Sequence, residues 1–260
     1  MKKLALALVA LLPLAASCSK DGEITLEQDN VSVDYYSKVT VKASDNDCRW
    51  GSEDEFIATV SEKGEIKGEH VGTTRVYAEK DGNRAYCTVT VNPVYDTFFF
   101  PTMSWGASKQ AVKDAQNPSL VSYWMEDQDE NGIIYKSLGF NYPNGMPWVI
   151  YTFDNNNRLF GSGLTLPMSA DDMFWNWLVQ YYYKSDYETP TGGMILLDAY
   201  TLTDSDNACV YEPSADYTQV IATFIATQHL QPTSSNGKKK APLALKAVES
   251  IKNIAAKAAK

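Results

Sequence analysis

The chain has 260 residues, of which 31 are aromatic (6 Trp, 16 Tyr and 9 Phe), and it carries 23 basic against 32 acidic side chains. This length fits two domains, and the composition is that of a globular protein. Setting aside Lys2 with Lys3 (+2) and the lysine-rich segment 238–260 (+6) leaves a net charge of −17 on residues 4–237. Such a surface repels phosphates, so nucleic acid is excluded as an expected partner.

Residues 1–18 have the pattern of an export signal, in which two lysines precede an apolar stretch from Leu4 to Leu14 and small residues lead to Cys18. The stretch is shorter than the roughly 20 apolar residues of a typical transmembrane helix. Leu14 and residues 15–18 resemble a bacterial lipobox, which implies a lipid anchor on Cys18 as the mature N-terminus. An ordinary cleaved signal that leaves a free thiol is the alternative. Among lipoproteins, the following Ser19 favours the outer membrane, on its exterior or its periplasmic face.

Residues 22–93 are predicted to form an all-β sandwich. From Ile24 to Val91 apolar residues alternate with polar ones in short runs, and turns such as Asp81-Gly82 separate the runs. The most informative residues are Trp50, Ser52, Ala58–Val60, Gly64–Gly68, Gly72, Thr73, Val76, Ala78 and Tyr86–Val91. In their order they resemble the bacterial Ig-like domain, group 2. This resemblance implies a spacer or adhesion module of a kind that rarely carries catalysis.

Three cysteines remain once Cys18 is assigned to the lipid. Cys48 and Cys87 fall in the same predicted domain, and a disulfide between them would contribute roughly 4 kcal/mol by closing the loop in an oxidising compartment. Two free thiols are the alternative. Cys209 lies in a short apolar run and is expected to be a buried thiol. His70 has no second His or Cys at ligand spacing, so we expect no metal site there.

Residues 94–230 are predicted to form a separate domain, because 25 of the 31 aromatic residues lie between Tyr95 and Phe224. Its helix and strand patterns predict an α+β domain with helices and an antiparallel sheet. Ser108 and Ser169 are suitable N-caps for two helices. The expected helices are 109–116 and 169–183, and the expected strands are 120–125, 133–140, 148–153, 159–166, 194–201, 208–211 and 219–226. The element order, the helix start at Trp105–Ser108 and the hairpin from Tyr151 to Leu159 resemble the β-lactamase-inhibitor-like fold. That resemblance implies an envelope-assembly or protein-inhibitor role, with a concave sheet as the contact surface.

The helix expected at 169–183 is apolar on almost every side. One side carries Met173, Phe174, Trp177, Leu178 and Tyr181, and the other carries Trp175, Val179, Tyr182 and Tyr183. Such a helix is either buried on two sides or presents one side to a partner. The second alternative makes Trp175, Val179, Tyr182 and Tyr183 the candidate ligand-binding residues, with Trp175 and Tyr182 as an exposed platform for a glycan or a protein.

Asp127, Asp129 and Asn131, followed by Gly132, copy the first half of a calcium-binding loop, but position 12 is Leu138 instead of a carboxylate. A hairpin turn is the favoured interpretation, and calcium is the weak alternative. The chain shows no motif for a nucleophile, a phosphate loop or a catalytic metal, so we expect neither enzyme activity nor a cofactor. A carboxylate pair of a glycoside hydrolase is the less favoured alternative.

Residues 231–260 are predicted to form a linker and a basic amphipathic helix over 243–259. This helix could bind an anionic lipid surface weakly, stay solvated, or dock on the preceding domain. The predicted organisation is therefore a signal (1–18), an Ig-like domain (22–93), an α+β domain (94–230) and a tail (231–260). The expected function is that of an envelope lipoprotein that binds a glycan or a protein without catalysis.

Overall fold

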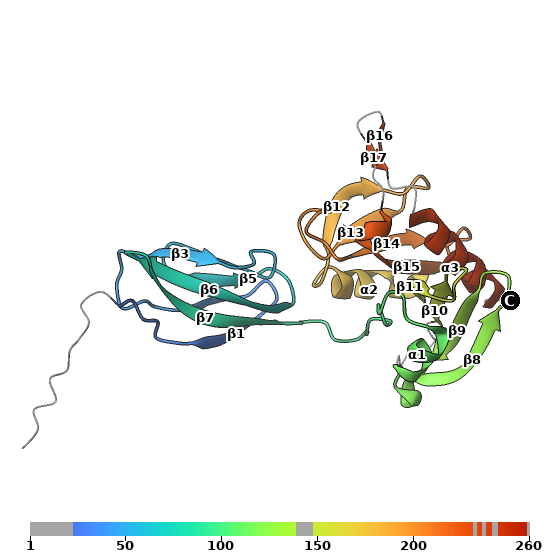
Figure 1. Ribbon diagram of the computed structural model, residues 1–260, viewed down its shortest axis with the longest axis horizontal. Helices are drawn as coiled ribbons and strands as arrows, with labels where there is room; N and C mark the ends of the chain where they lie inside the picture. Colours follow the sequence, from blue (N-terminus) through green and yellow to red (C-terminus); the bar gives the residue numbers. More distant parts are fainter. Residues whose placement is uncertain (1–22, 139–147, 231–232, 236–237, 241–243, 259–260) are drawn as a thin grey trace, which may run out of the picture.

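The computed structural model describes residues 23–138, 148–230, 233–235, 238–240 and 244–258. They form two domains joined by a single connection after residue 92 (Figure 1). Cys18 and the predicted export signal lie outside the described residues. Among the helices of the described part, none is long and apolar enough to span a membrane.

The N-terminal domain is a sandwich of two sheets. One sheet has the order β1-β7-β6-β3, with β1 parallel to β7, and the other has the order β2-β5-β4. The strands are β1 (Asn30–Asp34), β2 (Lys38–Thr40), β3 (Arg49–Ser52), β4 (Ala58–Val60), β5 (Glu65–Gly68), β6 (Gly72–Lys80) and β7 (Asn83–Asn92). In β7, Cys87, Val89 and Val91 are buried while Thr90 is exposed, as the alternating sequence predicts. The all-β prediction for this domain is therefore confirmed.

Of the two alternatives for Cys48 and Cys87, the structure has the free thiols and not the disulfide. Cys87 lies on β7, whereas Cys48 directly precedes β3, and β6 lies between these two strands in the sheet. Two strand spacings amount to roughly 10 Å, which exceeds the Cα separation that a disulfide can bridge. Cys209 is a fully buried thiol, as expected.

The C-terminal domain is built on a ten-stranded sheet with the order β16-β17-β12-β13-β14-β15-β11-β10-β9-β8. Its strands are antiparallel apart from β12, which pairs with β17 in parallel. The strands are β8 (Val121–Asp127), β9 (Gly132–Ser137), β10 (Trp148–Phe153), β11 (Leu159–Pro167), β12 (Tyr183–Glu188), β13 (Met194–Leu197), β14 (Asn207–Pro213), β15 (Gln219–Ala226), β16 (Thr233–Ser235) and β17 (Lys238–Lys240). The helices are α1 (Lys109–Asp114), α2 (Asp171–Leu178) and α3 (Ala244–Ala258), with short 3-10 turns η1 (Pro118–Leu120), η2 (Met168–Ala170) and η3 (Thr227–His229).

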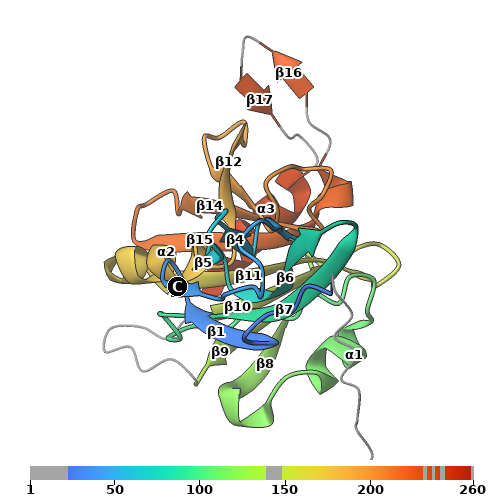
Figure 2. The same ribbon diagram turned by 90° about the vertical axis from the view of Figure 1, so that its left-hand side faces the viewer.

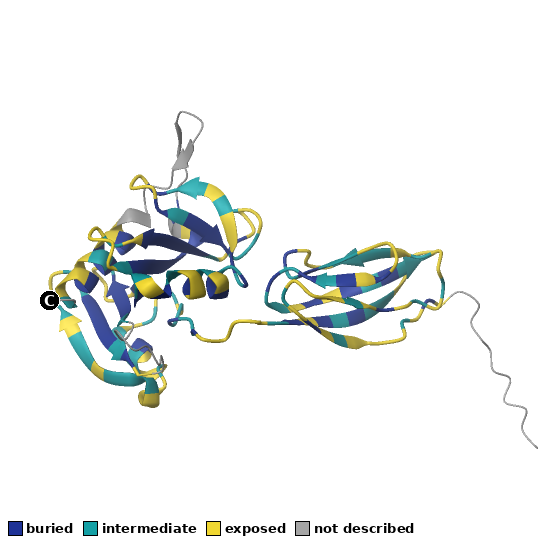
Figure 3. Ribbon diagram, turned by 180° about the vertical axis from the view of Figure 1, so that it is seen from behind, coloured by how far each residue is buried: buried dark blue, intermediate teal, exposed yellow. Residues whose placement is uncertain are grey.

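Helices cover both faces of this sheet (Figure 1). The aromatic core, which includes Phe174, Trp177 and Phe224, lies on the face covered by α1 and α2. The other face carries smaller aliphatic residues and is covered by α3. The centre of the sheet is buried while its rim is exposed (Figure 3). The described part of the chain is thus mostly β, with few helices.

The C-terminal helix is part of this domain. Ala247, Val248, Ile251, Ile254 and Ala255 are all buried against the sheet. On β11, a Cβ added to Gly163 would lie 2.8 Å from Cγ2 of Ile251, so glycine is what lets α3 approach the strand so closely. Of the three alternatives for the basic amphipathic helix, docking on the domain agrees with the structure, because α3 shares its hydrophobic clusters with strands that precede residue 230.

The helix expected at 169–183 is shorter than predicted. It begins at Asp171 after the 3-10 turn η2, and it ends at Leu178. Its N-cap is Ala170 instead of Ser169, although Asp171 and Asp172 do lie in its first turn. Tyr183, the last residue of the expected helix, instead begins β12 and pairs with Leu197 of β13.

Candidate functional site at the domain junction

The predicted ligand-binding residues do not form one exposed platform. Tyr182 is only 4% exposed, and its ring lies 5.9 Å from Phe100 and 6.0 Å from Phe224 in the aromatic core. The prediction that Tyr182 is exposed is wrong because the chain turns after Leu178 and carries this ring over the sheet. Trp175 is half-buried, with its ring edge-on to Tyr211 at 5.2 Å. Among the four candidates, Tyr183 is exposed, at 41%.

Val179, the fourth candidate, lies at the contact between the two domains. Its carbonyl oxygen accepts a hydrogen bond from the Tyr35 hydroxyl at 3.1 Å. The carbonyl oxygen of the next residue, Gln180, accepts from the backbone N–H of Val71 at 2.7 Å. The turn after α2 is therefore the surface on which the Ig-like domain rests. Figure 2 views the molecule from the Ig-like end, with α2 at the left.

The side chain of Gln180 fixes the segment that joins the domains. This residue is fully buried, and its Oε1 accepts from the backbone N–H groups of Val94 at 2.6 Å and Tyr95 at 2.9 Å. Its Nε2 donates to the Tyr95 carbonyl at 2.9 Å and to the Trp177 carbonyl at 3.3 Å. One amide group thus satisfies both backbone donors at the start of the second domain, and the connection is not a free linker.

Aromatic rings from both domains meet beside this turn. In the Ig-like domain, His70 stacks on Phe56 with ring centroids 3.9 Å apart, and His70 Nδ1 lies 2.7 Å from the Phe56 carbonyl oxygen. Tyr200 of the C-terminal domain contacts both rings, at 5.2 Å from Phe56 and 6.0 Å from His70. Tyr183 stands edge-on to Tyr200 at 5.3 Å and 82°. Tyr200 is 45% exposed, so the cluster opens to solvent at Tyr183 and Tyr200.

The loop that carries Tyr200 is fixed by its own hydrogen bonds. The Asp198 carboxylate accepts from the backbone N–H of Asp206 at 3.0 Å and from Nδ2 of Asn207 at 2.9 Å. Thr201 and Asp204 are hydrogen-bonded across the turn that follows Tyr200. The ring of Tyr200 is therefore held in place by its loop and by the Ig-like domain together.

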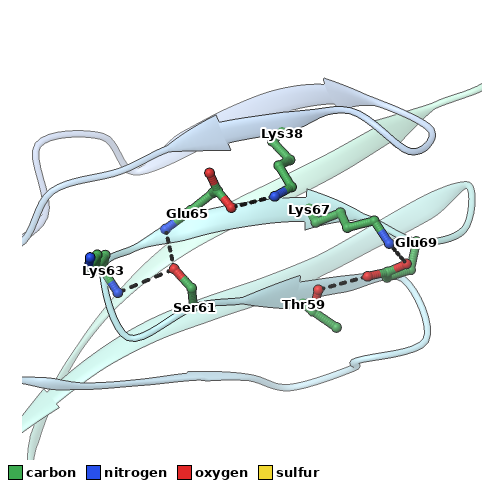
Figure 4. A network of polar contacts seen from close by, with 7 residues as sticks. All are labelled: Lys38, Thr59, Ser61, Lys63, Glu65, Lys67 and Glu69. Atoms are coloured by element: carbon green, nitrogen blue, oxygen red, sulfur yellow. Dashed lines mark hydrogen bonds and ion pairs between the residues drawn. The ribbon is translucent and has the colours of Figure 1, made fainter.

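The surroundings of Tyr200 are acidic. Burial raises the pKa of its phenol, and the nearby Glu69, Asp54 and Glu55 add to that increase. Glu69 belongs to a network on the β2-β5-β4 sheet, where it accepts from Lys67 at 2.7 Å and from Thr59 at 2.9 Å (Figure 4). Burial also lowers the pKa of His70, which favours a neutral imidazole whose Nδ1 carries the proton toward the Phe56 carbonyl oxygen.

The calcium-like loop forms the turn between β8 and β9. The Lys257 ammonium of α3 lies 2.8 Å from the Asp127 carboxylate and 3.1 Å from the Asp129 carboxylate. Asn131 donates through Nδ2 to the carbonyl oxygens of Phe153 and Asp154. Lys257 therefore supplies the positive charge that these carboxylates face, and the favoured hairpin interpretation agrees with the structure.

A hollow with a volume of about 450 Å³ lies between the β14–β15 turn and α3. Lys252 on its wall forms an ion pair at 3.1 Å with Glu212, whose side chain is almost fully buried. Thr191 donates to the other Glu212 oxygen at 3.1 Å. Ser214 and Thr218 hydrogen-bond to Asp216 at the rim of the hollow and lower the pKa of that carboxyl group. These acids are held by partners within the fold.

The sequence did not single out Phe56, Gln180 or Tyr200. Tyr200 was placed in a strand over 194–201, whereas β13 ends at Leu197 and leaves Tyr200 on a loop. Phe56 and Gln180 carry no motif, and their role arises from contacts between segments at least 85 residues apart. An isolated Gln between two apolar runs was the one available signal for a buried polar contact.

Residues 21–89 match the family model of the bacterial Ig-like domain (group 2), so the N-terminal domain is an Ig-like domain of this group. No curated protein matches the chain in sequence. One similar solved structure is described as "Structure of the S-layer protein SbsC, domains 5-6"; it is 12% identical, with 84% of this chain and 96% of that chain covered. Its TM-score of 0.23 is too low for that likeness to support a conclusion about this protein.

Proposed function

We propose that this protein is a lipid-anchored, non-catalytic binding protein of the bacterial outer membrane. The Ig-like domain favours a surface or adhesion role. The single observation that carries the proposal is the fixed junction, which presents Tyr183 and Tyr200 together at the surface. Rigid tyrosines provide contact area at low entropic cost and therefore suit binding surfaces. The ligand is a glycan or a protein, and the Ig-like domain holds the C-terminal domain away from the membrane.

An envelope-assembly or inhibitor role is the second candidate, through the resemblance to the β-lactamase-inhibitor-like fold. That role would use a concave face of the sheet. In the described part of the chain, α3 covers one face of the central strands, and α1 and α2 cover the other. We therefore favour binding at the junction.

The anchor is tested by labelling cells that express the full chain with an alkyne analogue of palmitate. The wild type should incorporate the label and fractionate with the outer membrane, and Cys18→Ala should lose the label. Ser19→Asp should shift the protein toward the inner membrane. A Cys18→Ala variant that still incorporates label, or a wild type without label, would contradict a lipid anchor at Cys18. Protease treatment of intact cells then distinguishes the exterior from the periplasmic face.

A further inference from the structure

The geometry points to a composite binding site at the domain junction, and we propose that its ligand is a neutral glycan. Tyr183 and Tyr200 form the contact surface, and Phe56 and His70 of the Ig-like domain hold Tyr200 in position. This inference rests on the proposed binding function and makes the Ig-like domain part of the site as well as a spacer.

The two tyrosines form an exposed edge-to-face pair, which we call the corner. Their rings stand 82° apart with centroids 5.3 Å from each other, so one ring face lies next to a wall formed by the other ring. Each residue keeps a little under half of its surface exposed. A pyranose has an apolar C–H face that packs on an aromatic ring, while its hydroxyl groups point outward toward polar side chains.

The corner exists before any ligand arrives. Tyr183 is fixed by its register opposite Leu197 in the sheet, and Tyr200 by its hydrogen-bonded loop and by Phe56. Phe56 is itself stacked on His70, which is almost fully buried. A preformed surface avoids the cost of ordering side chains on binding, which matters most for a ligand with a small contact area.

The charge around the corner selects the class of glycan. Asp54, Glu55 and Glu69 lie close enough to Tyr200 to raise the pKa of its phenol. Glu69 is ion-paired with Lys67, so it is Asp54 and Glu55 that make the surroundings acidic. Acidic surroundings repel uronates, sulfates and phosphates. Carboxylates accept hydrogen bonds from neutral sugar hydroxyl groups. A protein partner of standard size would bury about 800 Å² on each side, which two exposed rings do not supply.

The test is titration of the full lipoprotein in detergent micelles with three sets of polysaccharides. The sets are neutral (dextran, mannan, laminarin), anionic (heparin, alginate) and cationic (chitosan). We expect saturable binding to a neutral polymer, weakened about tenfold or more by Tyr183→Ala and by Tyr200→Ala. Tyr200→Phe keeps the ring and should retain most of the affinity. Tyr123→Ala is the matched control, because Tyr123 is an exposed tyrosine on β8, away from the junction.

The contribution of the Ig-like domain is tested at Phe56. Phe56→Leu keeps an apolar side chain but loses the ring contact with Tyr200. It should weaken binding even though the side chain at position 56 does not contact the ligand. Phe56→Tyr should restore the affinity, and circular dichroism should show the same fold for both variants. Equal affinity for wild type and Phe56→Leu would overturn the composite site.

The remaining outcomes separate this inference from the proposed function. Neutral-glycan binding that survives both tyrosine substitutions would overturn the site but leave a glycan-binding lipoprotein. Binding to the anionic or cationic set alone would overturn the ligand class. Absence of binding to every polysaccharide would overturn the proposal that the ligand is a glycan. The labelling of Cys18 and the cell fractionation test the lipid anchor independently of that result.

Discussion

Replacing Gln180 with alanine should loosen the connection between the domains. The substitution removes an acceptor from the backbone N–H groups of Val94 and Tyr95, and a donor to the Tyr95 carbonyl. Each net hydrogen bond contributes about 1 kcal/mol, and a buried group left without a partner costs about 1–3 kcal/mol. Val94 and Tyr95 have exposed side chains, so water can reach part of the freed backbone. We therefore expect Gln180→Ala to lower the free energy of opening the connection by about 2–3 kcal/mol.

The assay is amide hydrogen exchange on the full chain, together with chemical denaturation. A loss of about 2–3 kcal/mol corresponds to exchange at Val94 and Tyr95 that is roughly 30- to 150-fold faster. Gln228→Ala is the matched control, because Gln228 is exposed. If the two amides exchange at the wild-type rate in Gln180→Ala, the amide group does not fix the connection, and the reasoning is refuted.

Three further predictions follow from buried groups. Because burial lowers the pKa of His70 below that of an unfolded histidine, near 6.5, its contribution to stability is complete above that pH and is lost as the pH falls through the folded-state pKa. His70 faces the Phe56 carbonyl oxygen, Tyr35 and Tyr200, with Glu69, Asp54 and Lys67 nearby. The melting temperature should therefore fall between pH 7.5 and pH 5.5, and it should fall less in His70→Gln. An equal fall in both proteins would contradict this prediction. Lys252→Met should destabilise the domain by about 2–4 kcal/mol in urea, because it leaves the Glu212 carboxylate buried without its ion pair, and adding Glu212→Gln should recover much of the loss; a single variant with wild-type stability would show the pair to be dispensable. Ile251→Ala should cost about 3 kcal/mol because this side chain is fully buried over Gly163, and unchanged urea unfolding would argue against α3 as part of the core.

Alternation of apolar residues was enough to predict the β-sandwich and several strands of the second domain. The prediction for β7 succeeds because Cys87, Val89 and Val91 face one core, and period two is a local property of the chain. The expected strand over 148–153 coincides with β10, and the expected strand over 219–226 coincides with β15. These segments are determined by burial on both faces of a sheet.

Contacts between segments that are distant in the sequence explain why local patterns did not predict the end of α2 and the docking site of α3. Residues 179–183 continue a helical apolar pattern, but pairing of Tyr183 with Leu197 and the contacts of Gln180 with the connection end the helix at Leu178. The amphipathic pattern of α3 was recognised, but its destination depends on Gly163 and Gly161, whose missing side chains admit the helix. Single glycines on a strand do not change the apolar pattern of that strand, so the docking site of α3 was not predictable from periodicity.

The candidate site was predictable only in part, for the same reason. Tyr183 was identified because it belongs to an aromatic-rich segment, and its exposure supports that choice. Its neighbour Tyr200 and the ring of Phe56 come from a distant loop and from the other domain. Periodicity assigns faces within one element, whereas this surface arises between elements.

The most direct test of the account is a nuclear magnetic resonance titration of the soluble mature chain with the oligosaccharide of whichever neutral polymer binds. A site shared by both domains predicts that the ring signals of Tyr183, Tyr200 and Phe56 shift together, with one binding constant. Shifts confined to one domain, or centred on the hollow beneath α3 around Lys252, would contradict a site shared by both domains.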